Sequence, residues 1–327
     1  GGWRPVLFQV DEKTPEGNFV MTRGPEATPA DADGVLHDRD VIVFMAREAG
    51  RRGPDHSLPE GAKTRASLEL KGPGSGDSSW VYLSRFENGA PNHDLKPVSR
   101  LLDQGKAFRC RFPTYRYDAL VNDPEKNPTP TINIDRLWIL PEAGGNGKNI
   151  IDRQKTRGMI TFLGGMIKIR FSESIVNGGI VAYKPGPVRI LSHSYMYPRF
   201  PMGIKGPGFS IDSILVDTLT LTATTIRVPF NPGAVMHRMK LALGMDLTPD
   251  AKGMVFYNSE NREGFRIDGR MDDREKDFRP VKDEWRVITG PPGTQIIITR
   301  FDPMLFEKGE IRTTYNDDES DEHPPEN

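Results

Sequence analysis

The residues with the clearest capacity for chemistry lie in one short segment, residues 188–199, with the sequence VRILSHSYMYPR. Because side chains alternate between the two faces of a strand, this pattern predicts a strand with two chemically different faces. One face carries Arg189, Leu191, His193, Tyr195, Tyr197 and Arg199. Aromatic rings suit the apolar face of a sugar and guanidinium groups suit carboxylates, so this face predicts the binding of a saccharide or a protein partner. The alternative is an exposed sheet face or a protein interface, where Tyr and Arg are also common.

An acidic cluster is the second candidate site. It consists of Asp268, Asp272 and Asp273 in the sequence IDGRMDDRE. Hard cations such as Ca²⁺ need several carboxylate or carbonyl oxygens, and a loop of this kind supplies some of them. The spacing differs from that of an EF-hand loop, and Arg270 and Arg274 compete for the carboxylates. We therefore expect a solvated turn with ion pairs, and a metal site is the weaker hypothesis.

Histidines near carboxylates are the third candidate. His37 precedes Asp38 and Asp40 in the sequence LHDRD, and folding can bring a carboxylate to His193 or His237. General acid–base catalysis needs such a pair within hydrogen-bond distance. Six histidines scattered through 327 residues favour structural or surface roles instead. The sequence lacks G-x-S-x-G, H-E-x-x-H, Walker A and Rossmann motifs, which excludes several common enzyme classes, and no motif predicts a cofactor.

Charge and cysteine content narrow the class of protein further. The chain has 44 Lys and Arg against 45 Asp and Glu, so we expect no long-range attraction to nucleic acid or to an anionic membrane. Cys110 is the only cysteine, which excludes an intrachain disulfide, and we expect it to be buried. No apolar run reaches the roughly 18 residues of a membrane-spanning helix. Because the sequence begins with Gly1 rather than Met, we expect either a processed, exported protein or a trimmed chain, and we favour export to a periplasmic or extracellular location.

The pattern of short segments predicts an all-β chain. Its 33 glycines and 28 prolines favour many turns over long helices. Residues 65–71 and 79–86 alternate on either side of a Gly-rich turn and predict a hairpin. Residues 97–104 predict one short helix, and residues 211–230 predict two strands in sequence or one bent strand.

These elements predict one large, mostly antiparallel β-sandwich over residues 1–306, with few short helices. A loop-rich stretch near residues 141–158 is the candidate for an internal boundary. Residues 307–327 form an acidic tail, in which residues 316–327 carry six acidic side chains and no Lys or Arg. That composition favours disorder over docking against a partner.

The entry into residues 188–199 resembles a pattern found in galactose mutarotase-like proteins. The matching residues are Gly186, Pro187, Val188 and Arg189, followed by the alternation over residues 190–197. Looser matches are the long strand at 218–225 and the sequence GFRIDG at 264–269. The resemblance implies a β-supersandwich, a fold whose members include sugar epimerases, polysaccharide lyase domains and non-catalytic subunits. No motif in the chain matches the catalytic His and Glu residues of that family.

Three functions follow, in order of preference. The first is a non-catalytic, exported binding or structural subunit that contacts carbohydrate or a protein partner through a broad sheet face. The second is a carbohydrate-active enzyme of the epimerase or lyase type, working around His193 and Tyr195. The third is an assembly protein whose strand edges and tail build an oligomer or a larger complex.

Overall fold

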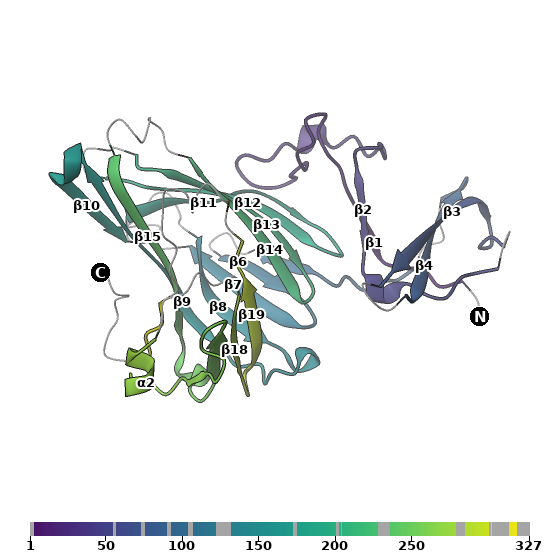
Figure 1. Ribbon diagram of the computed structural model, residues 1–327. Helices are drawn as coiled ribbons and strands as arrows, with labels where there is room; N and C mark the ends of the chain where they lie inside the picture. Colours follow the sequence, from purple (N-terminus) through teal and green to yellow (C-terminus); the bar gives the residue numbers. More distant parts are fainter. Residues whose placement is uncertain are drawn as a thin grey trace.

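The computed structural model describes residues 3–54, 57–72, 76–89, 93–103, 107–121, 132–172, 175–200, 203, 205–227, 236–278, 285–300, 302 and 314–318. Regular structure in these residues is almost entirely antiparallel β-sheet (Figure 1). The one α-helix among them is α2 (Asp273–Lys276). Single 3₁₀ turns are η1 (Pro29–Asp31), η2 (Ala46–Glu48), η3 (Pro141–Ala143), η4 (Leu163–Gly165) and η7 (Pro249–Ala251). The predicted all-β fold is confirmed.

Two four-stranded sheets form the central sandwich (Figure 1). In spatial order, the first contains β5 (Arg100–Asp103), β6 (Ala107–Arg111), β7 (Tyr115–Val121) and β8 (Ile132–Ile139). The second contains β11 (Val176–Pro185), β12 (Ile190–Pro198), β13 (Gly208–Val216) and β14 (Leu219–Arg227). A buried cluster joins Phe108, Cys110 and Phe112 of the first sheet to Ile190 and Leu215 of the second. This core determines which face of β12 points inward.

A third sheet continues from β8. Trp138 and Asn149 form an antiparallel bridge, and the chain then enters β9 (Ile151–Phe162). β9 lies between β10 (Ile167–Ser172) and β15 (Met236–Leu247). The glycine at position 158 of β9 leaves room for the Phe171 ring, because an added Cβ would overlap that ring.

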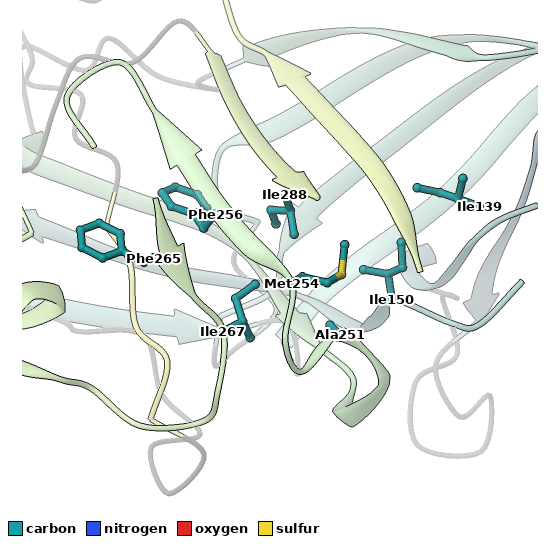
Figure 2. Close-up of a cluster of buried hydrophobic side chains, with 8 residues drawn as sticks. All are labelled: Ile139, Ile150, Ala251, Met254, Phe256, Phe265, Ile267 and Ile288. Atoms are coloured by element: carbon teal, nitrogen blue, oxygen red, sulfur yellow. The ribbon is translucent and has the colours of Figure 1, made fainter. Parts of the chain in front are cut away.

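The fourth sheet closes one end of the molecule. Its spatial order is β17 (Phe265–Arg266), β16 (Val255–Asn258), β18 (Trp285–Gly290) and β19 (Gly293–Ile298). Figure 2 shows the buried cluster formed where Met254, Phe256 and Ile288 meet Ile139 and Ile150. Ile139 ends β8 before the segment near residues 141–158, and Met254 follows that segment, so the parts of the chain on its two sides share one core. The single domain over residues 1–306 stays a prediction.

The N-terminal strands lie to one side of the sandwich (Figure 1). β1 (Phe8–Asp11) pairs with β2 (Val41–Phe44), and β3 (Ala62–Lys71) pairs with β4 (Ser78–Phe86) in the predicted hairpin. Residues 22–26 extend along the edge of β11, where Arg23 bridges Tyr183. The N-terminal segment therefore covers one edge of the β11–β14 sheet. At the other edge, all nine residues of β14 are exposed.

The helix predicted over residues 97–104 is wrong. Residues 100–103 form β5, which pairs with β6. The backbone N–H groups of Val98 and Ser99 both donate to the carbonyl of Pro187, which holds this segment extended against the turn before β12. The prediction for residues 211–230 holds in its two-strand form: β13 and β14 are antiparallel and meet at a tight turn where Thr218 has a φ of 79°.

The described part of the acidic tail packs on the fourth sheet. Residues 314–318 contain neither helix nor strand, as expected. The Tyr315 ring stacks on Phe265 and Phe278, with centroid distances of 5.5 and 5.9 Å. Asp317 Oδ2 accepts hydrogen bonds from the backbone N–H groups of Asp268 and Gly269. Residues 307–313 and 319–327 lie outside the described residues, so their predicted disorder stays a prediction.

Candidate functional site

The candidate site lies on the face of the β11–β14 sheet that points away from β5–β8, which we call the outer face. Ile190 and Leu215 are in the sandwich core, so the alternate residues of each strand point outward. The cross-strand register gives the members of the outer face as Lys184, Ala182, Gly179 and Asn177 of β11; Leu191, His193, Tyr195 and Tyr197 of β12; Ile214, Asp212, Ser210 and Gly208 of β13; and Leu221, Ala223, Thr225 and Arg227 of β14.

A histidine–carboxylate pair lies at the centre of the outer face. His193 and Asp212 are direct cross-strand partners on β12 and β13. The His193 Nδ1 atom lies 2.6 Å from Asp212 Oδ1, so the carboxylate fixes the orientation of the imidazole. The side chains of His193 and Asp212 are 30% and 62% exposed, so solvent reaches both members of the pair. A histidine held by a carboxylate is suited to hydrogen-bond a hydroxyl or to transfer a proton.

Two tyrosines extend this row along β12. The rings of Tyr195 and Tyr197 have centroids 5.8 Å apart and are tilted by 41°. Small residues make room for Tyr195, whose cross-strand partners are Gly179 and Ser210. An added Cβ at Gly208 would lie 2.6 Å from the Tyr195 hydroxyl oxygen, so the ring extends over the Gly208 backbone. The glycine at this position therefore sets the place of the ring.

Basic side chains surround the tyrosines. Lys205 Nζ lies 4.9 Å from the centroid of the Tyr197 ring, in cation–π contact. Arg199 and Lys205 are partners in an isolated antiparallel bridge, so their side chains project to the same side of the sheet. Arg227 is the partner of Gly208 and is exposed at the end of β14. The fold thus brings four of the predicted site residues to the same face of the sheet: His193, Tyr195, Tyr197 and Arg199.

Arg189, the fifth predicted binding residue, has a different environment. It precedes β12, and its side chain is only 12% exposed. Its Nε donates to Asp11 Oδ2 at 2.7 Å, and its guanidinium lies 5.3 Å from the centroid of Phe19. The structure places Arg189 in the attachment of the N-terminal segment rather than among the exposed groups of the outer face.

The three aspartates of the acidic cluster have separate partners. Asp272 caps α2 through a capping box with Glu275, in which each side chain accepts from the other residue's backbone N–H at 2.8 Å. Asp268 Oδ1 accepts from the backbone N–H of Arg270, and Asp273 pairs with Lys276 at the surface. Among the described residues, no group of three His, Cys, Asp or Glu side chains is arranged to hold a metal ion. The cluster therefore has the geometry of a capped turn.

His37 is bound within an exposed loop. Its Nε2 lies 2.8 Å from Asp33 Oδ2, and its backbone N–H donates to Asp40 Oδ2. The hydrogen bond from His37 lowers the pKa of Asp33, and backbone hydrogen bonds from His37 and Lys13 lower the pKa of Asp40. The predicted partner Asp38 takes no part in these contacts. The His237 side chain lies outside the described part of the structure.

Sequence reasoning did not identify Asp212, Lys205 or Arg227. A usable signal existed for Asp212, because His193 and Asp212 each lie seven residues from the segment 200–205, which contains Pro201 and Gly203. A hairpin centred there pairs the histidine with the aspartate. Lys205 begins the sequence KGPGFS, which indicates a turn and gives no sign of the Tyr197 contact. The position of Arg227 depends on the register of two further strands.

Comparisons with protein-family models, with curated proteins and with solved structures found no match to this chain. No helix in the described residues is long and apolar enough to cross a membrane.

Proposed function

We propose that the chain is a non-catalytic saccharide-binding protein whose binding surface is the outer face. The observation that carries this proposal is the row formed by the His193–Asp212 pair and the adjoining rings of Tyr195 and Tyr197. Tyrosine rings offer large apolar area at low cost in conformational entropy, and the polar groups beside them supply directed hydrogen bonds. This combination suits a sugar, which has apolar C–H faces and hydroxyl edges.

The supporting strands make this surface rigid. β12 has hydrogen-bonded neighbours on both sides, and Ile190 anchors it to the sandwich core at 0% exposure. Sites on rigid strands lose little entropy when a ligand binds. The resemblance to galactose mutarotase-like proteins, which rests on residues 186–197, agrees with a carbohydrate ligand and stays a prediction, as does the expected location outside the cytoplasm.

The experiment starts from a glycan array probed with the whole chain, followed by calorimetric titration of the best glycan. Replacement of Tyr195 by Ala removes one ring, and we expect affinity to fall about tenfold or more. Tyr195→Phe keeps the ring and is expected to retain most of the affinity. Tyr257→Ala removes a partly exposed ring from β16 and is the matched control. Absence of glycan binding by the wild type, or equal binding by Tyr195→Ala, contradicts the proposal.

A carbohydrate-active enzyme is the second candidate, favoured by the 2.6 Å contact between His193 and Asp212. In that case His193 is the acid–base group and Asp212 is its positioning residue. Incubation with the bound glycan and detection of epimerised or unsaturated sugar separates the two functions. If His193→Ala loses turnover but keeps its affinity for the glycan, the chain is supported as an enzyme.

If there is neither binding nor turnover, a native mass above 36.6 kDa favours an assembly protein.

A further inference from the structure

Positive charge is concentrated at one end of the outer face. Lys205 lies over the Tyr197 ring and is the bridge partner of Arg199, and Arg227 is the partner of Gly208, over which the Tyr195 ring extends. Asp212 is the only carboxylate among the outer-face residues, and it is bound to His193. The chain as a whole has a formal net charge of −1. The clustering of three cations around two partly exposed rings therefore differs from the nearly neutral charge of the chain as a whole.

We infer that the ligand of the outer face is an anionic saccharide, one that carries carboxylate or sulfate groups. This inference rests on the proposed function and adds the chemical class of the ligand. A sugar that stacks against these rings presents its substituents to the basic side chains beside them. Arg199 and Arg227 can each bind a carboxylate or sulfate through two parallel N–H donors, and Lys205 offers a compact ammonium.

The position of Lys205 supports this assignment. Its ammonium group lies over the Tyr197 ring, 4.9 Å from the centroid, so the cation directly adjoins the pair of rings. A sugar that stacks on the neighbouring Tyr195 ring brings its substituents toward this cation, because the two ring centroids are 5.8 Å apart. Exposed ion pairs of this kind are weakened by salt, because the Debye length is about 8 Å at physiological ionic strength.

A saccharide is favoured over a nucleic acid, which also combines stacking with backbone charge. Nucleic-acid-binding surfaces carry basic stripes that follow many phosphates, and their domains are usually strongly basic. Here three cations surround a single pair of rings, and the sequence has no excess of basic residues. An anionic sugar polymer with isolated charges matches this arrangement more closely.

Affinity electrophoresis of the whole chain tests the inference with four probes: polygalacturonate, dextran sulfate, neutral dextran and single-stranded oligothymidylate. We expect retardation by polygalacturonate or dextran sulfate at least tenfold stronger than by neutral dextran, decreasing as salt is added. Lys205→Gln and Arg227→Gln are each expected to weaken it by roughly two- to fivefold. Lys276→Gln removes an exposed cation from α2 and is expected to change nothing. Binding of polygalacturonate identifies carboxylate as the recognised group, and binding of dextran sulfate identifies sulfate.

The outcomes separate this inference from the proposed function. If neutral and charged dextrans retard the chain equally, and Lys205→Gln and Arg227→Gln have no effect, the ligand is not an anionic saccharide. The proposal of saccharide binding is unaffected by that result. Charged-polymer binding that survives Tyr195→Ala, or that oligothymidylate reproduces, overturns both, because the rings then play no part in selecting a sugar. Circular dichroism of each variant verifies that the β-fold is kept.

Discussion

The Nε atom of Arg189 donates a hydrogen bond to Oδ2 of Asp11, whose side chain is fully buried, across a separation of 178 residues. The Nζ atom of Lys184 lies 3.2 Å from the other oxygen of this carboxylate. The Gln9 side chain completes the network, since its Oε1 accepts from the backbone N–H groups of Val188 and Arg189. These contacts attach β1 to the turn that leads into β12, the strand with the candidate site.

Replacement of Asp11 by Asn is expected to lower the free energy of unfolding by about 3–5 kcal/mol. The substitution keeps the shape of the side chain but leaves the Arg189 and Lys184 cations buried with no counter-charge. Urea unfolding followed by tryptophan fluorescence measures the loss.

Asp250→Asn is the matched control, because Asp250 pairs with Lys148 at the surface, where both side chains are about half exposed. Its effect is expected to stay within about 1 kcal/mol. Similar small losses for Asp11→Asn and Asp250→Asn would show that the buried network contributes little to stability.

The Arg189 network also shows what the sequence can and cannot predict. Alternation along residues 188–199 correctly predicted a strand with His193, Tyr195 and Tyr197 on one face, because the period of two is a local property. The same alternation placed Arg189 among the binding residues. Its partner Asp11 lies 178 residues earlier in the sequence, and nothing in the local pattern indicates that contact.

The hairpin at residues 65–71 and 79–86 was predictable for a similar reason, since its turn and both strands are contiguous in sequence. The segment at 97–104 was not, because its extended form depends on hydrogen bonds to Pro187. The pairing of His193 with Asp212 lies between these cases. It follows from the hairpin register once the segment 200–205 is taken as the turn, and no other feature of the sequence indicates it.

Two glycines of the third sheet are expected to respond in opposite ways to replacement by Ala. An added Cβ at Gly158 of β9 would overlap the Phe171 ring, whereas an added Cβ at Gly244 of β15 meets nothing within 4 Å. Gly158→Ala is expected to destabilise the chain by about 1–3 kcal/mol through overpacking. Gly244→Ala is expected to be neutral or to stabilise by up to about 1 kcal/mol, because Ala loses less chain entropy on folding. Thermal unfolding of the two variants measures both effects, and equal losses would contradict the assigned packing of Phe171.

Cys110 is expected to resist thiol reagents in the folded chain. Its side chain is 0% exposed in the sandwich core, and burial, with a contribution from the Asp118 charge, raises the pKa of the thiol. Little thiolate is therefore present or accessible at neutral pH. Labelling with a chromogenic disulfide measures this directly: we expect negligible reaction in buffer and one thiol per chain in denaturant. Rapid labelling of the native chain would mean that the core between β6 and β12 opens readily.

Glu275 is expected to make stability depend on pH. Its side chain is 3% exposed, and burial raises the pKa of the carboxyl group, with Asp272 and Asp317 adding to the effect. The folded chain thus binds this proton more tightly than the unfolded chain, whose carboxyl has a pKa of 4.5. Its stabilising contribution is fully present below that value and is lost as pH rises through the folded pKa. Gln can still accept from the Asp272 N–H and donate to the Tyr315 hydroxyl, so we expect Glu275→Gln to fold. We expect this variant to lose less melting temperature than the wild type as the pH rises above 4.5. Glu263→Gln, at an exposed ion pair with Arg274, is expected to leave the profile unchanged. A Glu275→Gln profile that matches the wild type would place the pH dependence elsewhere in the chain.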